Sequence, residues 1–137
     1  MPEFSDDLAR VPLFSGLSNR QLKKLGSSFR ERTYGSGITI VREAQMSGVG
    51  FFVIVDGAAV VTVRGRKVAT LGPGDYFGEL AMISRNERGA TVTSEDTTRC
   101  LVIAFADFRR FVKENGDVAW KLLEQLADII ATERARK

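Results

Sequence analysis

The stretch Phe77-Gly78-Glu79-Leu80-Ala81, followed after a linker over residues 82–87 by Arg88-Gly89-Ala90-Thr91, is the most informative part of the chain. We call residues 77–91 the cassette. A glycine and the amides after it can approach a phosphate closely, a carboxylate can accept sugar hydroxyls, and a guanidinium can pair with phosphate oxygens. Each piece alone is also typical of a helix start or a solvated charge. In this order, they favour a site for a small anion such as a ribose phosphate.

Outward from the cassette, residues 33–105 contain short β-rich runs separated by glycines. This spacing is typical of a compact antiparallel sandwich or roll. The turn signals are Asp56-Gly57, Arg64-Gly65 and residues 72–75. The predicted strands are Ile38 to Val41, Gly50 to Val55, Ala58 to Val63, Val68 to Leu71, Thr91 to Thr93 and Leu101 to Phe105.

Helical patterns lie on both sides of this β-rich region. Residues 18–21 have the Ser-x-x-Gln spacing of a capping box, so we expect a helix from about Ser18 that buries Leu22, Leu25 and Phe29. After the strands, residues 108–112 fit a short helix. A final amphipathic helix begins at Gly116-Asp117 and has a polar, basic end at residues 132–137.

These patterns predict an α+β, mainly β fold. We expect an antiparallel sandwich or β-roll, similar to a jelly roll, with the cassette embedded in it and with an N-terminal helix and C-terminal helices at its flanks. The 137 residues suit one domain over 1–137, with the roll at about 33–105 and the C-terminal helices at about 106–134.

Composition excludes several classes of function. The chain has no histidine, which removes imidazole metal sites, histidine bases and Ser-His-Asp triads. Cys100 is the only cysteine and lies in an apolar run, so we expect a buried structural thiol. No apolar run reaches a membrane span and no signal peptide begins the sequence, which predicts a cytoplasmic protein without membrane contact. No residue set suggests an enzyme, a metal site or a cofactor.

The net charge of +3 combines 20 basic with 17 acidic residues spread along the chain. The one basic cluster, Arg64, Arg66 and Lys67, lies at an expected hairpin tip. We therefore expect no direct contact with nucleic acid.

The cassette resembles the phosphate-binding cassette of the cyclic nucleotide-binding domain family, found in cAMP-dependent protein kinase regulatory subunits, nucleotide-gated channels and the catabolite activator family. The resemblance extends over about Val11 to Ile130. It implies that Glu79 accepts the ribose 2′-hydroxyl, that Arg88 pairs with the phosphate and that backbone amides complete the anion cradle. The ligand-binding residues it implies are Phe77, Gly78, Glu79, Leu80, Ala81, Arg88, Gly89, Ala90, Thr91, Val61 and Ile129.

Two of these residues contact the base in the family. Val61 corresponds to a position that faces the base, although a strand valine is also typical of plain core. Ile129 lies at about the position from which the last helix covers the base, with Ile130 as the neighbouring alternative; either could instead pack on the roll. Trp120, at the start of that helix, is interpreted as a hinge or interface residue.

The sequence departs from the family pattern at two positions, and the second bears on the ligand. Ala44 replaces a usual turn glycine, which affects only a loop remote from the cassette. Gly89 stands where Ala or Ser is usual in cAMP binders and Thr often marks cGMP preference. The resemblance therefore favours cAMP as the ligand and leaves cGMP open.

The resulting hypothesis is a regulatory domain that binds cAMP and couples binding to movement of its C-terminal helices. Its output would pass to an effector protein or a fused effector domain, and a homodimer through the C-terminal helix is left open. The alternative is an interaction domain of the same fold that no longer binds nucleotide. An enzyme on a β-roll is a third class, which the absence of histidine disfavours.

Overall fold

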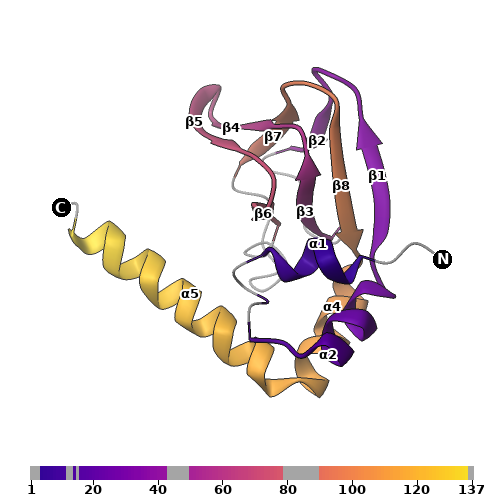
Figure 1. Ribbon diagram of the computed structural model, residues 1–137. Coiled ribbons are helices and arrows are strands. Elements are labelled where there is room, and N and C mark those ends of the chain that lie inside the picture. Colours follow the sequence, from indigo (N-terminus) through magenta and orange to yellow (C-terminus); the bar gives the residue numbers. More distant parts are fainter. Residues whose placement is uncertain (1–3, 12–13, 15, 43–49, 79–89, 136–137) are drawn as a thin grey trace.

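The computed structural model describes residues 4–11, 14, 16–42, 50–78 and 90–135. Within these residues, antiparallel strands form two sheets, and helices lie beside them (Figure 1). The predicted mainly-β fold, an antiparallel roll with flanking helices, is confirmed.

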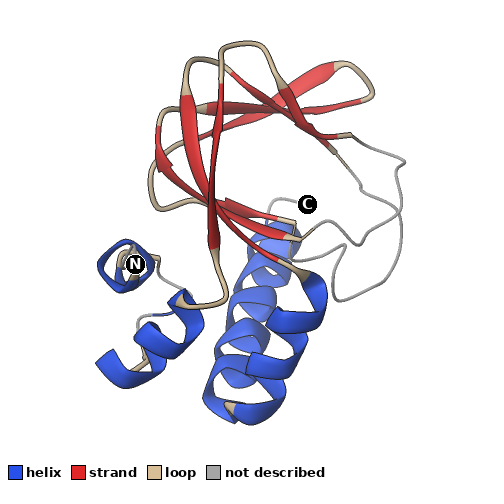
Figure 2. Ribbon diagram, turned by 90° about the vertical axis from the view of Figure 1, so that its right-hand side faces the viewer, coloured by secondary structure: helices blue, strands red, loops and turns tan. Residues whose placement is uncertain are grey.

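The first sheet has the order β1-β8-β3-β6, and the second has the order β2-β7-β4-β5. The strands of the first sheet are β1 (Arg30–Tyr34), β8 (Thr98–Ile103), β3 (Phe51–Asp56) and β6 (Tyr76–Phe77). Those of the second are β2 (Thr39–Val41), β7 (Thr91–Ser94), β4 (Ala59–Val63) and β5 (Arg66–Leu71). Figure 2 shows both sheets in one half of the molecule and the helices in the other.

Strand β3 is apolar on both faces because each face packs against a different layer. Successive side chains of a strand point to opposite faces. Phe51 and Val53 therefore join a helix-side core, whereas Phe52 and Ile54 face the second sheet. We call this second cluster the roll core; its buried members are Val41, Phe52, Ile54, Ala59, Phe77, Val92 and Cys100.

Two N-terminal helices, α1 (Ser5–Ala9) and α2 (Asn19–Gly26), cover part of the helix-side core. The predicted capping box of α2 is present: Gln21 N donates to Ser18 Oγ at 3.1 Å, and Ser18 N donates to Gln21 Oε1 at 2.9 Å. Leu22 and Leu25 are buried as expected. Phe29 is also buried, but it lies beyond the end of the helix.

Two C-terminal helices follow β8: α4 (Phe105–Glu114) and α5 (Gly116–Ala135). The sequence placed Phe105 at the end of a strand, and this was wrong, since Phe105 is the first residue of α4. Helix α4 buries Phe108, whose ring stacks on Phe51 with centroids 5.1 Å apart. Helix α5 buries Val118 and then runs outward from the body (Figure 1).

Candidate functional site

The cassette begins at strand β6, which is anchored on both faces. Phe77 pairs with Phe52 of β3, and the two rings stack with centroids 4.8 Å apart and planes at 3°. Tyr76 points the other way and packs its ring 5.4 Å from Phe51. The entry to the cassette is thus attached to both cores.

The turn before β6 is held by hydrogen bonds to β3 and by one within the turn. Ile54 N donates to Asp75 O and Gly74 N donates to Ile54 O, each at 2.9 Å. Asp75 Oδ2 accepts from Gly72 N at 2.8 Å. Gly78, directly after β6, has a φ of 99°, a conformation that glycine adopts without a steric cost. A substitution at Gly78 would therefore strain the first bend of the cassette.

The cassette ends in the other sheet. Ala90 is half-buried and leads into β7, which lies between β2 and β4. The cassette therefore connects an edge strand of the first sheet to an inner strand of the second. The two described ends therefore lie in different sheets, and β7, at the second end, pairs with β4, the strand that carries Val61.

The register of β4 and β7 places Val61 opposite Val92, and Thr62 opposite Thr91. Paired residues point to the same face of a sheet. Val61 and Val92 therefore face the roll core, and Thr91 faces the other side with Thr62. Of the first two residues of β7, Val92 is the one that shares a face with Val61.

The predicted site residues fall into four groups. Val61 and Phe77 belong to one cluster, the roll core, and Gly78, Ala90 and Thr91 lie at the two ends of the cassette. Ile129 lies in the second half of α5. The remaining predicted residues, Glu79, Leu80, Ala81, Arg88 and Gly89, lie outside the described residues.

Two side chains near Val61 were missed from the sequence. Val92 and Leu71 both pack in the cluster that contains Val61 and Phe77. Val92 is the only apolar residue in Thr91–Ser94, which is a signal of an inward-facing position. Leu71 pairs with Ala59, the first residue of β4. Only the register of the sheet shows that Leu71 lies near Val61.

Helix α5 is buried at its start, whereas its later turns carry exposed apolar side chains. Val118 has no exposed surface, whereas Trp120, Leu123 and Ile130 are 64%, 56% and 52% exposed. Large apolar side chains at these fractions indicate a surface that another group can cover. Ile130, the alternative to Ile129 for covering the base, is among them.

The described residues contain no group of three or more potential metal ligands from histidine, cysteine, aspartate and glutamate. In the same part of the chain, no helix has the length and hydropathy required to cross a bilayer.

Comparison with known proteins identifies relatives of this arrangement. The model of the cyclic nucleotide-binding domain family matches residues 31–115. The cyclic nucleotide-gated potassium channel mll3241 of Mesorhizobium japonicum is 34% identical over 112 residues, which cover 82% of this chain and 31% of the channel. The cAMP-dependent protein kinase regulatory subunit of Schizosaccharomyces pombe is 34% identical over 106 residues, covering 77% of this chain and 26% of the subunit.

Among solved structures, the catabolite activator protein of Thermus thermophilus superposes with a TM-score of 0.83 at 27% identity. The match covers 91% of this chain and 61% of that protein. The chain thus spans about a third or less of the two curated relatives.

Proposed function

This chain belongs to the cyclic nucleotide-binding domain family, and we propose that it is a non-catalytic regulatory domain that binds cAMP in preference to cGMP. The observation that carries the proposal is the placement of the cassette ends. The segment whose sequence resembles a nucleotide cassette leaves β6 of one sheet and enters β7 of the other, directly beside Val61. A ligand held by this segment would lie at the margin of the roll core.

In the proposed complex, the phosphate is bound by Arg88 and by backbone amides around Gly78, Leu80, Gly89 and Ala90. Glu79 accepts the ribose 2′-hydroxyl. An arginine can pair with a phosphate through two parallel hydrogen bonds, and enclosure by protein strengthens such a pair. The retention of both Glu79 and Arg88 in the sequence supports nucleotide binding over the alternative of an interaction domain without a ligand.

The base would rest against apolar side chains of the roll. We assign Val61 to this wall and add Val92 and Leu71, because they belong to the same cluster. Ile129 of α5 would cover the base from the other side when the helix moves onto the roll. Preference for cAMP rests on Gly89, which offers no hydroxyl to the amino group of guanine.

Binding would be coupled to the position of α5. The exposed Trp120, Leu123 and Ile130 support a helix with more than one packing position, since a ligand that contacts two positions differently shifts their populations. The output would reach an effector protein or a fused effector domain, in keeping with the small share of its relatives that the chain spans. A cytoplasmic location remains part of this proposal.

We propose that the protein forms a homodimer through α5. Trp120, Leu123 and Ile130 are spaced by three and seven residues, so they lie along one side of the helix and match the repeat of a two-stranded coiled coil. Light scattering of the purified protein tests this. A dimer that Leu123→Glu converts to monomers would support it, and a monomer at all concentrations would contradict it.

Calorimetric titration with cAMP, cGMP and AMP tests the proposed ligand. We expect saturable binding of cAMP, weaker binding of cGMP and little binding of AMP, which lacks the cyclic phosphate. Stronger binding of cGMP would overturn the selectivity. The absence of binding by any of the three would favour the nucleotide-free interaction domain.

A further inference from the structure

A single residue, Asn115, separates α4 from α5, and hydrogen bonds engage its backbone and side chain. Its N–H donates to Val112 O at 3.3 Å, and its carbonyl accepts from Val118 N at 3.0 Å, in the first turn of α5. Its Nδ2 donates to Phe111 O at 2.8 Å. With φ −131° and ψ 84°, Asn115 is not helical, so its conformation sets the direction in which α5 leaves.

The remaining bond of Asn115 comes from the other end of the chain. Gln21 Nε2 donates to Asn115 Oδ1 at 3.2 Å, in a partly buried contact. The same amide of Gln21 completes the capping box of α2 through its Oε1, which accepts from Ser18 N. One side chain thus joins the start of α2 to the residue between α4 and α5.

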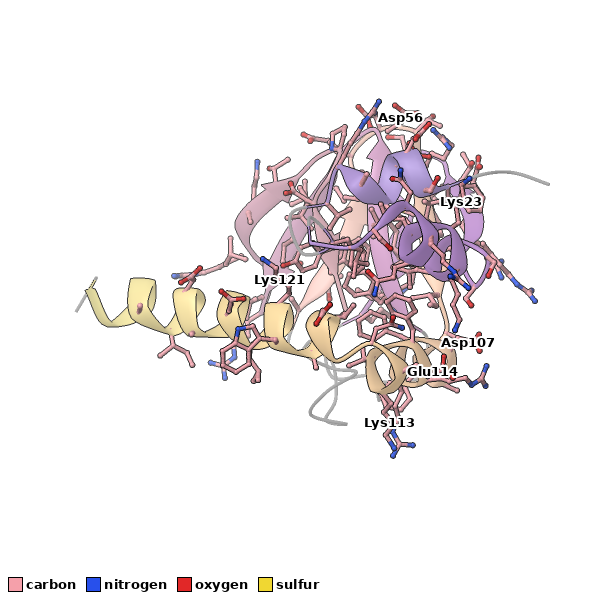
Figure 3. The ribbon with its side chains drawn as sticks, turned by 60° about the horizontal axis from the view of Figure 1, so that its bottom comes forward. Lys23, Asp56, Asp107, Lys113, Glu114 and Lys121 are labelled. Carbon is pink, nitrogen blue, oxygen red and sulfur yellow. The ribbon has the colours of Figure 1, made fainter. Side chains whose placement is uncertain are left out.

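Two further contacts also join the N-terminal part of the chain to α4 and α5. Lys24 Nζ lies 3.2 Å from Glu114 Oε2 at the end of α4, although both side chains are exposed and such pairs contribute little. The stem of Lys121 lies over Gly16, where an added Cβ would be 2.9 Å from Lys121 Cε. Figure 3 shows Glu114 at the end of α4 and Lys121 on α5, facing the body of the molecule.

We propose that Gln21 is a positioning residue for α5, because its hydrogen bond to Asn115 holds the helix in the direction seen here. In this direction, Trp120, Leu123 and Ile130 remain largely exposed. Because Ile130, the alternative to Ile129 for covering the base, is among them, we assign this direction to the nucleotide-free protein. The consequence for ligand affinity rests on the proposed function; the consequence for the direction of α5 does not.

A hydrogen bond made in only one of two positions shifts the balance between them. If Gln21 stabilises the nucleotide-free position, its loss raises the fraction of molecules that can bind, and the apparent affinity increases in proportion. The net contribution of a hydrogen bond between uncharged groups corresponds to a change of about two- to tenfold in that balance. Weakening this contact should therefore tighten cAMP binding.

The test variant is Gln21→Glu. A glutamate keeps the capping box, since its carboxylate still accepts from Ser18 N, but it has no hydrogen to donate to Asn115 Oδ1. Ser18→Ala is the matched control: it removes the cap of α2 and leaves the donor of Gln21 in place. An effect of general destabilisation would appear in both variants, whereas an effect of the Gln21–Asn115 bond appears only in the first.

Trp120 is the only tryptophan and lies five residues after Asn115, so its quenching by acrylamide reports on α5 without any label. In the absence of ligand, Gln21→Glu should change this quenching in the direction in which cAMP changes it in the natural protein. Ser18→Ala should not. In an Asn115→Ala background, Gln21→Glu should have no further effect, because the bond is already absent.

The outcomes separate the two proposals. Quenching by acrylamide that is the same in Gln21→Glu, Ser18→Ala and the natural protein overturns the role of Gln21, whether or not cAMP binds. Altered quenching together with cAMP binding about two- to tenfold tighter in Gln21→Glu supports it. A natural protein that binds no cAMP contradicts the proposed function, and the ligand-free quenching then decides the role of Gln21 alone.

Discussion

At the scale of single residues, Cys100 belongs to the roll core rather than to any reactive site. The side chain is fully buried on β8, and burial raises the pKa of the thiol to about 11. A thiol reacts as its thiolate, so Cys100 should resist thiol reagents at neutral pH while the protein is folded. The structure confirms the expected burial.

This pKa predicts a loss of stability at alkaline pH. The unfolded thiol loses its proton near its ordinary pKa of 9.0, whereas the folded thiol keeps it to about 11, so the unfolded state binds fewer protons between these values. The free energy of unfolding should fall there by up to about 1.4 kcal/mol per pH unit. Urea unfolding from pH 8 to 11 measures this. Cys100→Ala should lose that part of the slope, and an identical slope in both proteins would contradict the burial argument.

Arg88 of the cassette is the proposed partner of the phosphate. Arg88→Ala should weaken cAMP binding at least tenfold, because a charged hydrogen bond to a partly desolvated phosphate is worth roughly 1.5 to 3 kcal/mol. The unfolding temperature without ligand should be nearly unchanged. A folded variant with natural affinity would place the phosphate elsewhere.

The sequence predicts the cassette, whereas the structure shows which face of the sheet the first residues of β7 point to. The order Phe77 to Ala81 and Arg88 to Thr91 was sufficient to predict a nucleotide cassette. It could not show that Thr91 points away from Val61 and that Val92 points toward it, since facing depends on the pairing of β7 with β4. A shift of one residue in that register would exchange the two faces.

At the scale of elements, β3 joins the two cores, and Phe51 is its central contact with the helices. Its ring meets Phe14, Phe29, Tyr76 and Phe108 at centroid distances from 5.1 to 6.5 Å. These partners come from the N-terminal segment, β6 and α4. The position of β6, from which the cassette begins, therefore depends on the same ring.

Phe51→Ala should lower the free energy of unfolding by about 3 to 5 kcal/mol, the usual cost of emptying a buried phenylalanine site. Chemical denaturation measures it. Val68→Ala, at an exposed position of β5, is the control and should cost far less. A small loss at Phe51 would contradict a central packing role.

Helix α5 provides a prediction about movement. Hydrogen exchange across residues 122–132 should slow when cAMP is added, because the proposed docked position protects backbone that is otherwise free to open. The first turn, which contains the buried Val118, should change less. Equal exchange with and without ligand over the whole helix would mean that nucleotide binds without a moving lid.

The elements missed from the sequence share a physical cause. Residues of β1, Arg30–Tyr34, are exposed except for Tyr34, so the strand has no alternating apolar pattern. It is held by pairing with β8 and by the contact of Arg99 with Glu31 at 3.3 Å. Strand β6 has only two residues, and Phe105 continues an apolar run although the chain there begins α4. Long-range pairing decides the two strands, and the periodicity of the sequence does not record it.

At the scale of the whole molecule, the roll places the two ends of the cassette on different sheets, and α2 contacts the junction of α4 and α5 through Gln21. Sequence order alone predicted the roll and its flanking helices. It did not predict that residues near 21 and near 115 meet, since this contact spans most of the chain. This contact joins the N-terminal part of the chain to the residue from which α5 leaves.

Thermal unfolding with cAMP and with AMP tests the central claim most directly. A ligand that binds only the native state at a hundredfold excess over its Kd adds about 2.7 kcal/mol to the free energy of unfolding. We predict that cAMP raises the unfolding temperature accordingly and that AMP at the same concentration has far less effect. Equal shifts with both nucleotides, or no shift with millimolar cAMP, would contradict the account.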